Sequence, residues 1–348
     1  FKLEQKIHFK SIDALRFFAF FKVYLLHIPL QGDFPIFGFL KGGGGIGVAF
    51  FFVLSGFLIT YLLVHDKLVK GQININNFFM RRSFRIWPLF YLLVILAFVL
   101  PYQFKTDIGF HMVGGGYEPN WKYSFTFLEN YNMLLHDNFP NTTPLSVFWS
   151  LCIEEHFYIF WMLSIFILPL KRIFSFLIFC IGLAWIARFV EPHIFQNEMI
   201  VGNDLFTTID YFAIGGLLGY GAATNFQKLS AYINGVNVWV KRLLVFSVIA
   251  IVVFQSYVLP IEGMFFQLFR PTIIAILFTL LVAVFIPKDS KINIKNKTLN
   301  YLGSISYGLY VFHIIFIHIV FQYFINHKIV LDNWGTLSIY ILITLGGS

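Results

Sequence analysis

Long apolar stretches follow one another along almost the whole chain, separated by shorter polar segments. A helix satisfies its own backbone hydrogen bonds, which lipid cannot do, and it crosses the hydrocarbon core of a bilayer with roughly 20 residues. The pattern predicts an all-α integral membrane protein, a bundle of about ten transmembrane helices. The predicted spans lie near residues 12–31, 45–65, 85–101, 147–169, 173–190, 205–223, 242–260, 269–287, 302–325 and 335–348.

The composition supports a multi-pass membrane protein. Hydrophobic residues make up 58% of the chain and charged residues 12%, whereas soluble domains average about 25% charged residues. Cys152 and Cys180 both lie within apolar stretches, so we expect neither a disulfide framework nor a thiolate metal site. The chain begins at Phe1 and its last apolar stretch is short. We therefore expect trimmed ends and a single transmembrane domain over residues 1–348, with a truncated C-terminal span.

Lysine and arginine concentrate in alternate loops, and this bias predicts the orientation of the bundle. The segments before the first span and after the second, fourth, sixth and eighth spans are basic, whereas the other loops are richer in Asp and Glu. Basic loops tend to face the cytoplasm, so we expect both termini there. The net charge of +8 then reflects topology. Because the basic residues are spread over several loops without a nucleic-acid motif, no nucleic-acid partner is expected.

The first predicted span, "SIDALRFFAFFKVYLLH", contains four ionisable residues. A charge inside a bilayer costs at least about 2.5–3.5 kcal/mol, so such residues usually have a task. Arg16 and His27 are eleven residues apart and share one helix face, which predicts that both line an interior groove. Asp13 precedes Arg16 by one turn and is a candidate ion-pair partner. His27 can act as a general base near neutral pH, or it is a hydrogen-bonded core histidine.

Two further polar clusters enter later spans. In "RRSFRIWP", Arg82 and Arg85 suit paired hydrogen bonds to phosphate, although a positive-inside anchor is the alternative for the arginines at the start of this motif. In "WSLCIEEHFY", Ser150 and Glu154 are separated by four residues and share a helix face. Glu154 and Glu155 need cations or hydrogen-bond donors from neighbouring helices. The alternative is a set of salt bridges that only locks helices together.

The longest predicted loop, near residues 102–146, lies on the non-cytoplasmic side. It contains Tyr117, Asn120 and Trp121, and the polar residues 141–143. Loops of this length are usually functional or disordered. The segment either covers a pocket and contacts sugar, or it is an ordinary structured loop.

Taken in order, these motifs resemble those of the membrane-bound acyltransferase-3 family. Arg16 and His27 match the family's arginine, ten residues, histidine pattern, and "GIGVAFFFVLSGFLIT" resembles its glycine-aromatic second span. "RSFRIWP" matches its arginine, two residues, arginine pattern, "WSLCIEEHFY" its double-glutamate motif, and "SYGLYVFH" its penultimate span. His156 and Thr208 depart from the family pattern, because many members carry glutamine and arginine there.

The resemblance implies an enzyme of the bacterial cell (inner) membrane, with many spans and a cytoplasmic N-terminus. It implies an O-acyltransferase that moves an acyl group, expected to be acetyl, from cytoplasmic acyl-coenzyme A to a hydroxyl group. The implied acceptor is a cell-envelope or exported glycan, free or lipid-linked. Membrane lipid surrounds such a protein, and the reaction needs no metal.

The implied site combines the candidate residues of the spans. The residues expected to bind acyl-coenzyme A are Arg16, Arg82, Arg85 and Ser150. The residues expected to act in catalysis are His27 as general base, with Glu154 or Asp13 orienting or balancing the nearby charges. A covalent acyl-histidine or acyl-serine intermediate remains an alternative to direct transfer.

Two other classes of protein stay open on the sequence. A transporter or flippase for an acyl group or a lipid-linked glycan would also line a bundle with polar groups, but internal repeats are missing. A non-catalytic sensor or assembly partner is the third interpretation. His27, His156 and His313 lie on three different spans, and no ligand spacing indicates that they hold a metal ion.

Overall fold

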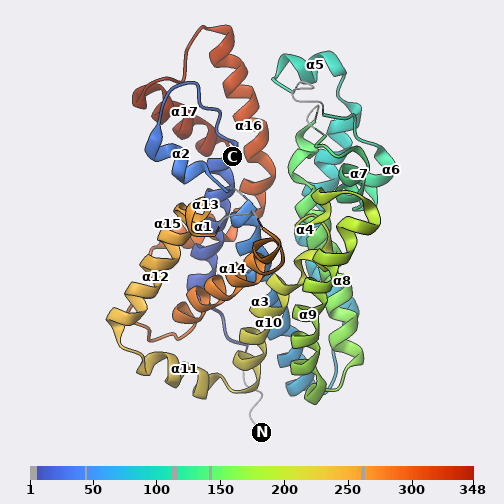
Figure 1. The fold of residues 1–348 in the computed structure, drawn as a ribbon, viewed down its shortest axis with the longest axis vertical. Coiled ribbons are helices and arrows are strands. Elements are labelled where there is room, and N and C mark those ends of the chain that lie inside the picture. Colours follow the sequence, from blue (N-terminus) through green and yellow to red (C-terminus); the bar gives the residue numbers. More distant parts are fainter. Residues whose placement is uncertain (1–5, 44, 111–115, 141–142, 260–262) are drawn as a thin grey trace.

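The computed structural model describes residues 6–43, 45–110, 116–140, 143–259 and 263–348, and the described residues form helices and connecting loops without strands (Figure 1). The longer helices are α1 (Lys10–His27), α3 (Gly45–Lys70), α4 (Ile75–Val99), α8 (Trp149–Ile167), α9 (Leu170–Phe195), α10 (Leu205–Thr224), α12 (Val238–Val253), α14 (Met264–Phe285), α16 (Ser306–Asn326) and α17 (Trp334–Gly347). Each predicted apolar stretch overlaps one of these helices, which confirms the all-α prediction.

Short helices connect the longer ones. They are α2 (Pro35–Lys41), α5 (Tyr102–Asp107), α6 (Trp121–Phe125), α7 (Glu129–His136), α11 (Phe226–Gly235), α13 (Gln255–Val258) and α15 (Lys297–Ser304), with the 3-10 turns η1 (Pro144–Val147) and η2 (Glu198–Ile200). Helices α5, α6 and α7 lie together at one end of the molecule, and α11 lies at the opposite end (Figure 1).

Six of the described helices are long and apolar enough to cross a bilayer, namely α3, α4, α8, α9, α14 and α16. Helices α11 and α12 meet at a bend of 93° and add a seventh span if they form one broken span. Helix α17 is apolar but shorter. A multi-pass membrane protein is thereby confirmed, whereas the number of about ten spans and the side of each terminus stay predictions.

Helices α3 and α10 pack backbone to backbone at the centre of the bundle. A Cβ atom on Gly215 would lie 2.2 Å from the carbonyl oxygen of Val53, and one on Gly219 would lie 2.3 Å from that of Phe57. The two glycines are four residues apart, a spacing that lets membrane helices approach closely. This contact fixes α3, which supplies one wall of the candidate site.

A fully buried ion pair joins α9, α10 and α14. Arg188 pairs with Asp210, and both side chains are 0% exposed. Thr272 donates a hydrogen bond to Asp210 at 2.5 Å, and Arg188 also donates to the carbonyl oxygens of Thr207 and Leu268 at 2.8 Å each. Burying a charge is tolerated only when it is paired and hydrogen-bonded, as both charges are here. These residues hold three helices together.

The described residues of the long predicted loop, 102–110, 116–140 and 143–146, include α5, α6, α7 and most of η1. The buried Glu129 carboxylate accepts hydrogen bonds from Tyr117, Ser124 and Asn132. Burial, and then the charge of Glu129, raise the pKa of the Tyr117 hydroxyl, so it stays a donor at neutral pH. Trp121 is 59% exposed.

The same segment also contributes to a cavity wall. Phe139, Ser146 and Val147 line the larger of the two cavities described below. Asn141 and Thr142, named above among the polar residues of this loop, lie outside the described residues.

Candidate active site

Arg16 and Lys22, two cationic residues inside α1, contact different groups. A guanidinium nitrogen of Arg16 lies 3.5 Å from a carboxylate oxygen of Asp13, which confirms the predicted pair. Lys22 donates hydrogen bonds to the carbonyl oxygens of Leu40 and Gly42 at 2.5 and 2.7 Å. It therefore holds the connection between α2 and α3 against α1.

A first cavity, of about 60 Å³, lies between α1, α3, α4, α8 and α16; we call it the arginine pocket. It has room for a few water molecules or a narrow chain of similar bulk. Its polar lining consists of Arg16, Ser55, Arg85, Ser150, Glu154, Tyr158, Ser306, Tyr307 and Tyr310. Four of the predicted site residues are thus brought together from three helices, because Arg16 on α1, Arg85 on α4, and Ser150 and Glu154 on α8 all line this pocket.

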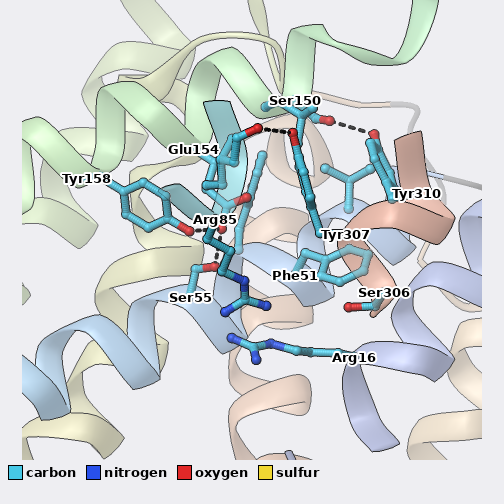
Figure 2. A pocket seen from close by; sticks show the side chains of 14 residues that line it. Arg16, Phe51, Ser55, Arg85, Ser150, Glu154, Tyr158, Ser306, Tyr307 and Tyr310 are labelled. Atoms are coloured by element: carbon cyan, nitrogen blue, oxygen red, sulfur yellow. Dashed lines mark hydrogen bonds between the residues drawn. The ribbon is translucent and has the colours of Figure 1, made fainter. Parts of the chain in front are cut away.

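The guanidinium groups of Arg16 and Arg85 point toward one another across the arginine pocket (Figure 2). Arg16 is held from behind by Asp13. Arg85 is exposed and makes no hydrogen bond or ion pair with the described residues. Its planar fork of N–H donors is therefore free for an anionic ligand.

Glu154 is bound by hydroxyl groups. Its carboxylate accepts short hydrogen bonds from Ser55 on α3 and Tyr158 on α8 (Figure 2). The guanidinium carbon of Arg82 lies 5.8 Å from the centroid of the Tyr158 ring. Arg82 thus lies beside the arginine pocket without lining it. The neighbouring Glu155 accepts a hydrogen bond from the Trp87 indole at 3.3 Å.

A second, larger cavity of about 760 Å³ adjoins the first; we call it the histidine cavity. Its size falls within the range of about 300–1,000 Å³ that is typical of ligand sites. Its polar lining consists of His27, Ser146, Trp149, Asn203, Thr208, Tyr211, Gln255, Gln267, Arg270, Tyr310 and His318. Val48, Phe52 and Tyr310 line both cavities, so these three side chains form the partition between them.

Arg16 and His27 line adjoining cavities instead of one groove. Their spacing predicted one interior groove along a shared face of α1. The partition of Val48, Phe52 and Tyr310 instead divides the space beside this face into two cavities. The Nδ1 atom of His27 lies 3.0 Å from the carbonyl oxygen of Val23, one turn earlier on α1. The same atom lies 3.3 Å from Nε2 of His313 on α16.

The predicted site residues omit four side chains that the structure brings to the site: Ser55, Tyr158, Tyr310 and His313. The sequence could have predicted Tyr158, because it follows Glu154 by four residues and so shares its helix face. The other three come from α3 and α16, and only packing brings them to α1 and α8.

The candidate metal-ligating histidines are placed differently from one another. His156 stacks on Tyr131, with ring centroids 5.7 Å apart, whereas His313 lies against His27. Among the described residues, no group of three or more His, Cys, Asp and Glu side chains could hold a metal ion.

Comparison with known proteins identifies the family of this chain. The family model described as an acyltransferase domain, that of the acyltransferase-3 family, matches residues 9–348. The chain therefore belongs to the acyltransferase-3 family.

Two relatives of the chain have established names. It is 27% identical over 321 residues to the peptidoglycan O-acetyltransferase OatA of Listeria monocytogenes. The aligned region covers 87% of this chain and 48% of the relative. The chain is 32% identical over 171 residues to the O-acetyltransferase OatA of Staphylococcus aureus, covering 47% of this chain and 26% of the relative. The chain thus spans half or less of the length of these relatives. No solved structure matches it significantly.

Proposed function

We propose that the chain is a membrane O-acetyltransferase that moves an acetyl group from acetyl-coenzyme A to a hydroxyl of a cell-envelope glycan, with peptidoglycan the favoured acceptor. The observation that carries this proposal is the pair of adjoining cavities. One is lined by two arginines and the other by His27, and they share only Val48, Phe52 and Tyr310. The names of the relatives support acetyl as the transferred group and peptidoglycan as the acceptor.

The arginine pocket is the proposed donor site. Arg16 and Arg85 face one another and attract the phosphate groups of coenzyme A, while Arg82 adds positive charge beside Tyr158. The pocket is too small for a nucleotide, so the adenosine and phosphates would stay at its mouth and only the narrow acyl-bearing arm would enter. Ser150 would contact that arm.

The carboxylates of the site have supporting roles. Asp13 holds the Arg16 guanidinium in place and balances its charge. Glu154, bound to Ser55 and Tyr158, ties α3 to α8 and offsets the positive charge of the arginines. Both residues act by orienting and balancing groups that touch the substrate.

The histidine cavity is the proposed acceptor site. It is large enough for a sugar unit and offers amide, hydroxyl, indole and guanidinium groups to sugar hydroxyls. His27 removes the proton from the acceptor hydroxyl as that oxygen bonds to the acetyl carbonyl carbon. The carbon–sulfur bond then breaks, and coenzyme A leaves as the thiol after taking up the proton from His27.

The proposed placement in the membrane follows the charge bias of the loops. The proposed topology has about ten spans and both termini in the cytoplasm of a bacterium, with residues 1–348 as one domain in the inner membrane. Arg16 lies near the start of α1 and His27 at its end, about 16 Å further along the axis. The donor pocket then faces the cytoplasm, where acetyl-coenzyme A is made, and the acceptor cavity faces outward, with membrane lipid around the bundle.

The test is acetyl transfer by the purified chain in lipid vesicles. Labelled acetyl-coenzyme A and soluble peptidoglycan fragments are supplied, and both labelled glycan and released coenzyme A are measured. His27→Ala should lower turnover by about 10²–10⁴, which is the usual contribution of a positioned general base, and should leave coenzyme A binding unchanged.

The matched control is His193→Ala, because His193 is exposed on α9 and lines neither cavity. It should transfer acetyl at the wild-type rate. Normal turnover in His27→Ala, or a wild-type chain that binds no coenzyme A, would contradict the proposed function.

A further inference from the structure

The structure places a second histidine behind the proposed base. His313 on α16 is fully buried, and its ring centroid lies 5.1 Å from that of His27. Its Nε2 atom lies 3.3 Å from Nδ1 of His27, so the two rings meet through one nitrogen each. The rings of Phe20 and Tyr310 pack against His313 at centroid distances of 5.8 and 5.6 Å and fix its orientation.

Backbone carbonyl groups determine where each ring carries its hydrogen. Nδ1 of His313 contacts the carbonyl oxygen of Tyr310, and Nδ1 of His27 contacts that of Val23. A carbonyl oxygen only accepts hydrogen bonds, so both Nδ1 atoms must be donors. In its neutral form His313 then presents the lone pair of Nε2, and that lone pair faces Nδ1–H of His27.

We infer that His313 is a positioning residue that holds His27 in the Nδ1–H tautomer and leaves Nε2 of His27 free to accept a proton. The opposite tautomer would turn the Nδ1 lone pair of His27 toward two acceptors, the Val23 carbonyl oxygen at 3.0 Å and Nε2 of His313 at 3.3 Å. That arrangement is repulsive and forfeits the hydrogen bond that the single Nδ1–H shares between the two acceptors. An acceptor behind a catalytic histidine also stabilises the imidazolium formed on proton uptake.

This inference deepens the proposed function and rests on it, because it assigns the proton-accepting atom of the same base. His27 lines the histidine cavity, so a free Nε2 is available to a hydroxyl bound there. Val23 lies on α1 itself, whereas His313 comes from α16. Proton acceptance by His27 is therefore linked to correct packing of α16 against α1.

The test combines spectroscopy with turnover. The whole chain is labelled with ¹⁵N-histidine in lipid nanodiscs, and the His27 signals are assigned by their loss in His27→Gln. One-bond N–H coupling then shows which ring nitrogen carries the hydrogen in the resting protein. We expect the hydrogen on Nδ1 of His27 and none on Nε2; a hydrogen on Nε2 would overturn the inference without any variant.

Two variants of His313 separate positioning from packing. His313→Phe keeps a ring but removes the acceptor, so the His27 signals should show a mixture of tautomers. Its kcat should fall by about 10–100-fold, as for other groups that orient a functional histidine, with KM for acetyl-coenzyme A unchanged. His313→Gln restores an acceptor near the Nε2 position and should recover the Nδ1–H signal and most of the activity. Wild-type kcat in a folded His313→Phe would overturn the inference.

His156→Phe is the matched control, because His156 is partly buried and lines neither cavity. It should change neither the His27 signals nor kcat. The two hypotheses can fail separately. An inactive wild-type chain with the hydrogen on Nδ1 contradicts the proposed function alone, whereas an active chain with the hydrogen on Nε2 contradicts only the assignment of His313.

Discussion

The hydroxyl oxygens of Ser150 on α8 and Tyr310 on α16 lie 2.6 Å apart at the partition between the two cavities. Each oxygen also lies 3.1 Å from the carbonyl oxygen of Val147. The three groups join α16 to the segment that begins α8. Tyr310 is thereby held where its ring separates the space beside the arginines from the space beside His27.

Removal of the Tyr310 ring should open this partition. The acetyl-bearing arm must pass this partition to reach His27, and in Tyr310→Ala the space around the arm widens. Water then reaches the thioester when no acceptor is bound, so coenzyme A release without acceptor should rise relative to acetyl transfer. Tyr310→Phe keeps the ring and should keep transfer and hydrolysis coupled, at a stability cost of about 0.5–1.5 kcal/mol for the lost hydrogen bond. Thiol release with and without glycan acceptor measures both. Equal ratios in Tyr310→Ala and the wild type would show that the ring is no barrier.

Arg85 should dominate donor affinity because its guanidinium faces the arginine pocket and has no hydrogen-bond or ion-pair partner in the part of the chain that the structure describes. Arg85→Gln removes at least one charged hydrogen bond, a loss of about 1.5–3 kcal/mol, which corresponds to binding weaker by roughly 10–150-fold. Arg85→Lys should lose less, since it keeps the charge but not the planar fork. Calorimetric titration with coenzyme A gives the affinities.

Arg81→Gln is the control for Arg85, because Arg81 lies on the same helix and is exposed outside both cavities. Its affinity should match that of the wild type. If the Arg81 and Arg85 variants lose affinity equally, the positive charge of the surface binds the donor, and the arginine pocket does not.

The proposed orientation can be tested by cysteine labelling from each side of the membrane. Leu135 on α7 is 70% exposed and Lys291 is exposed in the loop before α15. Native Cys152 and Cys180 are buried, so they should not react with an impermeant maleimide. Leu135→Cys should be labelled in intact cells and Lys291→Cys only after permeabilisation. The reverse pattern would place the arginine pocket on the outer side and exclude a cytoplasmic donor.

The contact between α3 and α10 should tolerate no side chain at Gly215. The Cβ of Gly215→Ala would lie 2.2 Å from the Val53 carbonyl oxygen, a backbone atom that cannot rotate away. Such overpacking typically costs about 1–3 kcal/mol, so the melting temperature should fall. Gly221→Ala, on the same helix with open space around its Cβ, should be neutral or stabilising by up to about 1 kcal/mol. Similar melting temperatures for both would contradict the close helix contact.

Several features of this protein follow from the sequence alone because they depend on local periodicity. The apolar stretches predict the longer helices, because an apolar segment in lipid satisfies its backbone hydrogen bonds within itself only as a helix. The Asp13–Arg16 pair follows from a spacing of three residues within one helix. The ordered motifs indicate the family, which the match over residues 9–348 confirms.

The tertiary structure decided which groups meet across helices. Glu154 was expected to need cations or hydrogen-bond donors, and only the packing of α3 against α8 shows that one of its donors is the hydroxyl of Ser55, beside that of Tyr158 on its own helix. His27 and Arg16 share a helix face, yet Tyr310 from α16 and side chains of α3 divide the space before them. His313 is 286 positions from His27 in the chain. Such contacts depend on how helices pack and on which polar groups then satisfy one another, a balance of many distant interactions that no local pattern records.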